Sequence, residues 1–201
     1  MSQTRILIDP GHGINTPGKR SPLWPDDTQL FEWEFNRDIA NRLQRQLTLY
    51  DIDSIILVPE IEDISLKERC NRANSHWSNN QLFGRDTILI SIHANAGGGT
   101  GWECYTSPGE TRSDKMATVF CKTAGTCFAP STKVRADYSD GDPDKEDQFY
   151  ILKHTKCPAI LTENFFMDNY EDCRLLMRDD FRDLIARMHV GAIQKIIDSK
   201  L

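Results

Sequence analysis

The sequence predicts an α/β domain built around a largely parallel β-sheet, and two observations carry this prediction. Short apolar runs bounded by turn residues alternate with longer segments of helical periodicity, which is the order expected when helices cover a parallel sheet. The chain has 201 residues with no linker or internal repeat, the size of one domain with a sizeable core. Residues 1–201 are therefore predicted to form a single domain.

Six runs are predicted to be strands because they are short, apolar and bounded by turn residues. Four of the six are rich in Ile, Leu and Val, as expected for strands buried on both faces. In chain order, the predicted strands span residues 5–9, 53–59, 87–93, 102–106, 148–152 and 159–163.

Helices are predicted where apolar residues recur at helical spacing. In segment 31–49 they recur every four residues, which predicts an amphipathic helix. Segments 65–77 and 112–128 are also predicted to be helices, and the apolar spacing from Phe181 to Ile196 predicts a long helix that packs against the sheet.

The segment 129–147 differs from the rest of the chain. It contains Pro130, Pro143 and six acidic residues, a composition that predicts a solvated acidic loop. Two interpretations stay open: an inert surface insertion, or a rim that shapes access to a substrate site, since long loops in compact domains are often functional.

Composition excludes several classes of partner. Acidic residues outnumber basic residues by 30 to 24, for a net charge of −6, and no basic cluster is present, so a nucleic-acid partner is not expected. The best apolar run, at 55–58, is far shorter than the roughly 18 residues of a transmembrane helix. The six cysteines include no C-x-x-C pair, and free, mostly buried thiols are expected.

Two of the predicted strands lead directly into a histidine. His12 follows the first strand, between Gly11 and Gly13, and His93 ends the third. Ligands bind outside the carboxyl ends of strands in open α/β sheets, so both imidazoles are expected at a ligand site, where the glycines allow close backbone approach. One such histidine is weak evidence for a metal, but two at equivalent strand ends favour one.

Two glutamates are candidates to complete this site. Glu32 flanks the apolar stripe at the start of the helix 31–49, with Asn36 one turn later, and Glu163 ends the last predicted strand. A helix-terminal acid and a salt bridge are the structural alternatives for these carboxylates. Two histidines and one carboxylate nevertheless match the three protein ligands of a catalytic zinc, and a further glutamate could accept a proton from water.

Four segments together resemble the zinc-dependent N-acetylmuramoyl-L-alanine amidases of the type-3 family. In the family's order, they are residues 8–13, 32–40, 91–95 and 158–163. The resemblance implies a zinc ion held by His12, Glu32 and His93, with Glu163 as the catalytic carboxylate. It also implies a three-layer α/β domain with a central, mostly parallel six-stranded sheet flanked by helices. Trp33 and the pair Asn164 and Phe165 depart from the family pattern and affect substrate detail.

The resemblance implies hydrolysis of the amide between the lactyl group of N-acetylmuramic acid and L-alanine, with peptidoglycan or a muropeptide as the substrate. A zinc peptidase or deacetylase with the same ligands, or a non-catalytic cell-wall-binding module, are the alternatives. Partner proteins are not predicted. Lys19 and Arg20, after the His12 turn, belong to a solvated loop or contact stem-peptide carboxylates.

The N-terminal residues do not have the pattern of a signal peptide. Met1 to Arg5 lead directly into an apolar strand without a basic region and a longer apolar stretch. The chain is therefore expected to be cytoplasmic as synthesised and to act on the cell wall after release or export, unless a signal has been removed.

Overall fold

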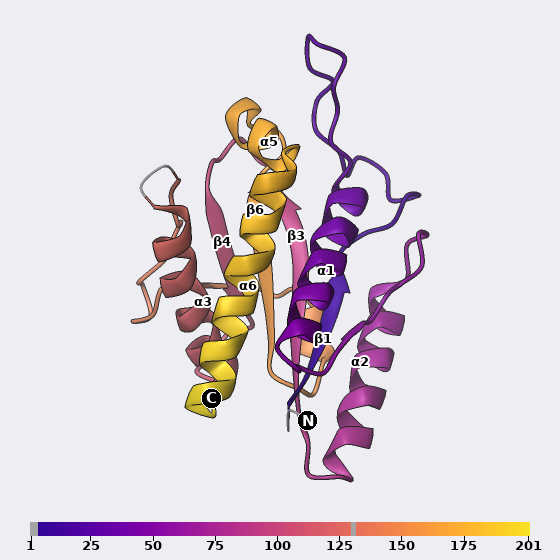
Figure 1. Cartoon of the computed structure of the whole chain (residues 1–201), viewed down its shortest axis with the longest axis vertical. Helices are drawn as coiled ribbons and strands as arrows, with labels where there is room; N and C mark the ends of the chain where they lie inside the picture. The colour runs from indigo at the N-terminus through magenta and orange to yellow at the C-terminus, as the bar shows by residue number, and fades with distance from the viewer. Residues whose placement is uncertain (1–3, 130–131) are drawn as a thin grey trace.

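In the computed structural model, six strands form one sheet with the order β2-β1-β3-β6-β4-β5 (Figure 1). The structure describes residues 4–129 and 132–201; residues 1–3 of the N-terminus, and Pro130 and Ser131 of the predicted acidic loop, lie outside this description. The strands are β1 (Thr4–Pro10), β2 (Ser54–Ile56), β3 (Asp86–Asn95), β4 (Trp102–Thr106), β5 (Lys145–Glu146) and β6 (Ala159–Phe166). Four of the five strand pairings within the described residues are parallel, and β4 pairs with β6 antiparallel. The predicted mostly parallel six-stranded sheet is confirmed.

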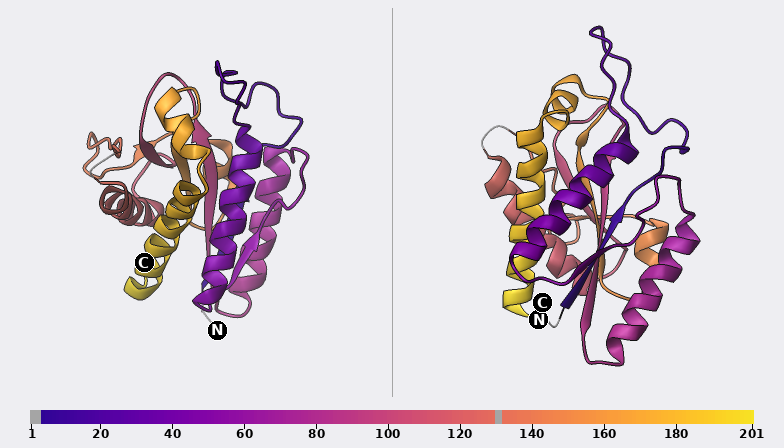
Figure 2. Two further views of the ribbon diagram at one scale, coloured as in Figure 1. Left: turned by 45° about the horizontal axis from the view of Figure 1, so that its top comes forward. Right: turned by 45° about the vertical axis from the view of Figure 1, so that its right-hand side comes forward.

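Helices cover both faces of this sheet, as Figures 1 and 2 show. They are α1 (Glu32–Leu49), α2 (Leu66–Gln81), α3 (Arg112–Phe128), α4 (Tyr150–His154), α5 (Tyr170–Leu176) and α6 (Asp179–Ser199). Residues of α1, α3, α5 and α6 pack into one apolar core, and residues of α2 and α4 pack into the other. The strands supply both cores, because Ile6 and Ile8 enter the first and Leu7 enters the second.

The predicted strand at 148–152 is wrong, because this segment contributes to helix α4. Ile151 and Leu152 are adjacent in sequence and both pack into the core beneath α2, whereas neighbouring residues of a strand point to opposite faces of the sheet. The sixth strand is instead β5, which lies inside the segment predicted to be an acidic loop. Helix α5 was not predicted.

The acidic segment 129–147 is only partly solvated. Asp137 and Asp140 are exposed as predicted. Asp144 is buried and accepts a hydrogen bond from Thr106 Oγ1 at 2.7 Å. Burial, together with the neighbouring carboxylate of Asp142, raises the pKa of Asp144 to about 8. The C-terminal part of the segment is therefore built into the edge of the sheet.

Two expectations from composition also have structural counterparts. The six cysteines are free, and five of them are buried. None of the helices in the described part of the chain has the length and apolar character needed to cross a membrane.

Candidate metal centre

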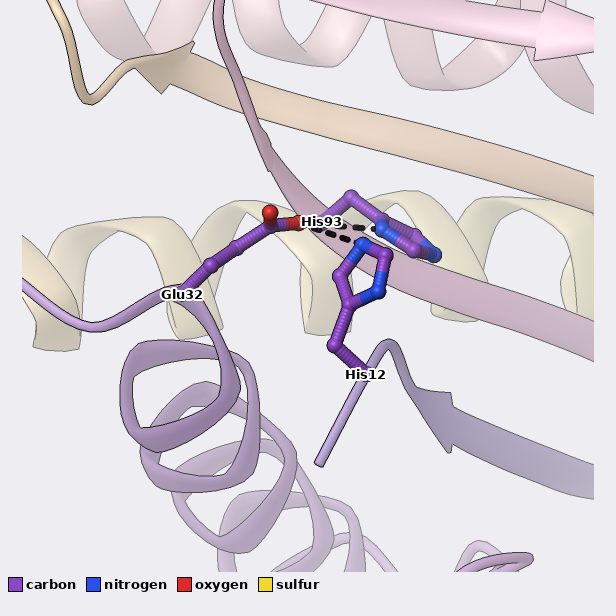
Figure 3. Close-up of side chains that lie close together, drawn as sticks. All are labelled: His12, Glu32 and His93. Atoms are coloured by element: carbon purple, nitrogen blue, oxygen red, sulfur yellow. Dashed lines mark hydrogen bonds and ion pairs between the residues drawn. The ribbon is translucent and has the colours of Figure 1, made fainter. Parts of the chain in front are cut away.

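His12, Glu32 and His93 converge at one end of the sheet (Figure 3). Each offers one nitrogen or oxygen atom, and these three atoms lie within 4.8 Å of one another. Glu32 Oε1 is 3.3 Å from His12 Nε2 and 3.1 Å from His93 Nδ1. The structure thus brings together the three residues that the sequence suggested as metal ligands.

The two histidines meet because β1 and β3 are parallel neighbours. Pro10 at the end of β1 is paired with Ile92 on β3, and the Gly11 amide continues the pairing by donating to the Ile92 carbonyl at 3.0 Å. The turn after β1 and the last part of β3 therefore project from the same edge of the sheet, where ligands bind in open α/β folds.

Two arginines hold the backbone of His12. This residue has a φ of +61°, a left-handed conformation that is unfavourable for a residue with a Cβ. Its carbonyl oxygen accepts hydrogen bonds from Arg37 Nη1 at 2.9 Å and from Arg69 Nη2 at 3.1 Å. Arg69 is itself buried and pairs with Asp9 at 2.6 Å. These contacts fix the turn that presents the His12 imidazole.

Sequence reasoning missed both arginines. Nothing in the apolar spacing of their helices indicates that either guanidinium is directed at the His12 turn, because basic residues on helices usually face water. The one available signal was Asp9, because a carboxylate at the end of a fully apolar strand requires a buried partner.

Glu32 is the first residue of α1, and its side chain points into the protein with only 1% exposure. Phe31, which the apolar spacing placed on the buried face, is the exposed residue before the helix. Asn36 Nδ2 donates to Glu32 Oε1 at 3.4 Å and to the Gly11 carbonyl at 3.1 Å. Asn36, one helical turn after Glu32, therefore contacts both the Glu32 carboxylate and the turn before His12.

The electrostatics of the centre favour an ionised glutamate. Burial opposes ionisation of Glu32, but hydrogen bonds with His12 and His93 hold its pKa well below the ordinary value. Burial lowers the pKa of His12. Burial also opposes protonation of His93, but the hydrogen bond with Glu32 and the negative charges of Glu163, Glu32 and Asp9 together outweigh it and raise the pKa of His93. Lys19 Nζ lies 3.8 Å from Glu32 Oε2, so this lysine borders the centre, while the Arg20 side chain is exposed.

The donor set fits a zinc ion. Two imidazole nitrogens and one carboxylate oxygen are a known ligand set of catalytic zinc, and tetrahedral bonds of about 2.1 Å separate neighbouring ligand atoms by about 3.4 Å. The carboxylate-to-imidazole distances of 3.3 and 3.1 Å are close to this separation. Glu32 Oε2 is also buried without a hydrogen-bond partner among the described residues, with Lys19 Nζ 3.8 Å away.

Glu163 lies on β6 beside this centre. It is paired in register with His93 of β3, and its Oε2 is buried with no hydrogen-bond partner in the described part of the chain. Burial raises the pKa of Glu163 to about 8; His93 and Lys19 oppose this shift, and Glu32 and Glu103 add to it. A carboxyl group with a pKa near neutrality is suited to accepting and returning a proton.

The sequence and fold match a known enzyme family. A family model described as N-acetylmuramoyl-L-alanine amidase matches residues 6–195. The chain belongs to this family. It is thus an N-acetylmuramoyl-L-alanine amidase, a hydrolase that degrades peptidoglycan of the cell wall. The resemblance of the four motif segments is confirmed, and the alternative of a non-catalytic cell-wall-binding module is not supported.

Individual relatives agree with this amidase assignment. The sporulation-specific N-acetylmuramoyl-L-alanine amidase of Bacillus subtilis is 31% identical over 98% of the chain and 69% of the relative. The amidase CwlM of Bacillus licheniformis is 33% identical over 95% of the chain and 68% of the relative. The crystal structure of an N-acetylmuramoyl-L-alanine amidase from Clostridium difficile 630 covers all of both chains with a TM-score of 0.82 and 26% identity.

Proposed function

We propose that His12, Glu32 and His93 bind a catalytic zinc ion and that Glu163 transfers protons during amide hydrolysis. The observation that carries this proposal is the convergence of three ligand atoms within 4.8 Å at the strand ends, with Glu163 paired beside His93. The substrate bond is the amide between the lactyl group of N-acetylmuramic acid and L-alanine. We also propose that residues 1–201 work as a single catalytic domain.

Each residue has a defined task in this proposal. The bound zinc ion supplies Lewis-acid activation of water and of the amide carbonyl. Glu163 accepts a proton from the attacking water at a carboxylate oxygen and later donates it to the departing nitrogen of L-alanine. The products are the free lactyl carboxylate and the free amine, which balances the addition of one water molecule.

The surroundings of Glu163 support this role. An isolated buried carboxylate is costly unless it is paired or protonated, and the buried Oε2 of Glu163 has no partner among the described residues. The parallel pairing with β3 places its backbone one strand from that of His93, about 4.8 Å away. Glu163 is therefore within reach of a substrate held at the centre.

Mass spectrometry of peptidoglycan digests tests the proposal. Wild type should release stem peptides with a free N-terminal L-alanine, while Glu163→Gln should release none and retain the wild-type zinc content. His93→Ala should lose both zinc and activity. Cleavage at another bond would instead support a zinc peptidase or deacetylase, and full activity of Glu163→Gln would remove Glu163 from the mechanism.

A further inference from the structure

A second polar cluster lies beside Glu163, on the side away from the metal centre. On β6, Glu163 is paired with His93 of β3 on one side and with Glu103 of β4 on the other. Residues paired directly across neighbouring strands point to the same face of the sheet. His93, Glu163 and Glu103 therefore form a row across one face, with the metal centre at one end and Glu103 at the other.

Glu103 is a buried anchor for two cations. It is only 2% exposed, and its Oε1 accepts hydrogen bonds from Arg135 Nε and, at 2.6 Å, from Lys145 Nζ. Its Oε2 accepts from Asn95 Nδ2 and from the Tyr105 hydroxyl, each at 2.8 Å. Both carboxylate oxygens are thus occupied, and one negative charge shared by two cations leaves a net charge of +1.

Arg135 is held rigidly while most of its hydrogen-bonding capacity remains unused. Its backbone amide donates to the Trp102 carbonyl at 2.8 Å, its Nε is bound to Glu103, and its guanidinium lies over the Phe166 ring, 5.3 Å from the centroid. Within the described residues, neither Nη group has a hydrogen-bond partner, and the side chain is 36% exposed. The open side of the guanidinium is therefore fixed in place and accessible.

Lys145 completes the pair from strand β5. Its ammonium group lies 5.8 Å from the centroid of the Tyr105 ring, and its side chain is 24% exposed. Across the described part of the chain, Glu103 is its one hydrogen-bond partner, although an ammonium group carries three donors. Arg135 and Lys145 together thus present unused cationic donors at the end of the row.

We propose that Arg135 and Lys145 form a subsite for a carboxylate on the stem peptide, at the residue that follows L-alanine. The inference rests on the proposed function above and extends it to substrate selection. A guanidinium with both Nη groups open matches the two oxygens of a carboxylate. Neutral sugar hydroxyl groups would leave the net positive charge of this cluster uncompensated.

The spacing agrees with this assignment. Neighbouring strands lie about 4.8 Å apart, so β4 lies about 10 Å from β3, two strands away. An extended peptide advances about 3.5 Å per residue. A peptide cleaved between the metal centre and Glu163 can therefore reach Arg135 and Lys145 with the side chain of its next residue.

Both cations come from the segment 129–147, which the sequence presented as an acidic loop. One of its two interpretations was a rim that shapes substrate access. Arg135 and Lys145 give this rim a specific chemistry. Hydrogen bonds to Glu103 hold both cations beside the site, although the segment that carries them is otherwise rich in acidic residues.

Matched probes test the subsite. Two muramoyl peptides would differ only at the residue after L-alanine, which carries a free carboxylate in one and the corresponding carboxamide in the other, with all other peptide carboxyls blocked. Wild type should have a KM about tenfold lower for the carboxylate probe, in line with a charged hydrogen-bonded pair. Arg135→Ala should remove this preference, with kcat changed by less than about twofold.

Further variants separate recognition from folding. Arg135→Lys keeps the charge but not the planar fork and should give an intermediate KM, while Lys145→Ala should raise the KM for the carboxylate probe alone. The matched control is Lys133→Ala, an exposed lysine two residues away, which should leave both KM values unchanged. Circular dichroism and zinc content should match wild type in each variant.

The outcomes distinguish this inference from the proposed function. Equal KM values for the two probes in wild type, or equal losses on both probes in Arg135→Ala, would overturn the carboxylate subsite and leave amide hydrolysis intact. If wild type released L-alanyl products from neither probe, the proposed function would fail and the subsite with it.

Discussion

Gly11 faces the imidazole of His93 with no room for a side chain. A Cβ atom built on Gly11 would lie 2.1 Å from His93 Cε1 and 2.5 Å from each ring nitrogen, far inside van der Waals contact. The turn after β1 can therefore approach the end of β3 this closely only because residue 11 has no side chain. Gly11 is therefore a structural requirement of the candidate metal centre.

Gly11→Ala should therefore displace the His93 ring and weaken zinc binding by about tenfold or more, as measured by competition with a chromophoric chelator. Gly125→Ala is the matched control, because a Cβ at Gly125 in α3 meets nothing within 4 Å. The control should keep wild-type zinc affinity and raise the free energy of unfolding by about 0.5 to 1 kcal/mol. Unchanged zinc affinity in Gly11→Ala would show that His93 is not a ligand.

Asn36 should tune the affinity of the centre. Its amide donates to Glu32 Oε1 and to the Gly11 carbonyl. Asn36 therefore orients the proposed ligand Glu32 and the turn that precedes the proposed ligand His12. Asn36→Ala should weaken zinc binding by about 10- to 100-fold. Asn41→Ala, on the exposed side of the same helix, should not. Identical affinities in the two variants would contradict an orienting role for Asn36.

Removing the buried arginine should destabilise the whole domain. Arg69 and Asp9 are each 2% exposed and 2.6 Å apart, and Arg69→Ala would leave Asp9 as an unpaired buried charge. We expect the free energy of unfolding in urea to fall by about 3 to 5 kcal/mol. Arg72→Ala, in the same helix with 28% exposure, should cost about 0 to 1 kcal/mol. Similar losses for both variants would argue against this account of the Arg69 pair.

A buried histidine outside the metal centre should make stability depend on pH. His189 Nδ1 lies 2.9 Å from the Ile185 carbonyl, which can only accept, and Nε2 lies 3.1 Å from Thr162 Oγ1. These contacts fit a neutral imidazole. Burial lowers the pKa of His189 from 6.5 to about 4 in the folded protein. Between these values the unfolded chain binds more protons than the folded one.

The stability contributed by neutral His189 is thus fully present above about pH 6.5 and is lost as the pH falls toward 4. Between about pH 7 and about pH 4.5, wild type should lose about 2.5 kcal/mol more unfolding free energy than His189→Gln. Urea unfolding at both pH values, with zinc removed from both proteins, measures the difference. Parallel pH profiles for the two proteins would show that His189 is not responsible.

The site residues that the sequence predicted are those whose position follows from their immediate neighbours in the chain. His12 directly follows one apolar strand and His93 lies near the end of another, so the rule for parallel sheets placed them at one edge. Glu32 and Glu163 were found because a carboxylate at the border of an apolar segment is unusual. The apolar spacing nevertheless placed Phe31 on the buried face of the helix, whereas Phe31 is exposed and Glu32 is buried.

The missed parts depend on contacts between distant segments. Arg37 and Arg69 reach the His12 carbonyl from two helices, and helical periodicity gives no sign of such contacts. The pairing of Arg135 and Lys145 on Glu103 likewise requires residues 134–146 to run beside β4. The prediction of a strand at 148–152 is wrong because the apolar run there is too short for its periodicity to distinguish a strand from a helix.

Strand β5 has a consequence for the design of new specificities. It lies at the edge of the sheet and contributes only two residues, while the proposed metal ligands all precede residue 94. The proposed metal ligands and the proposed carboxylate subsite therefore lie in separate segments of the sequence. A chimera that receives the loop from the end of α3 to β5 from a relative would exchange substrate preference, with the proposed metal ligands before the loop and Glu163 after it left unchanged.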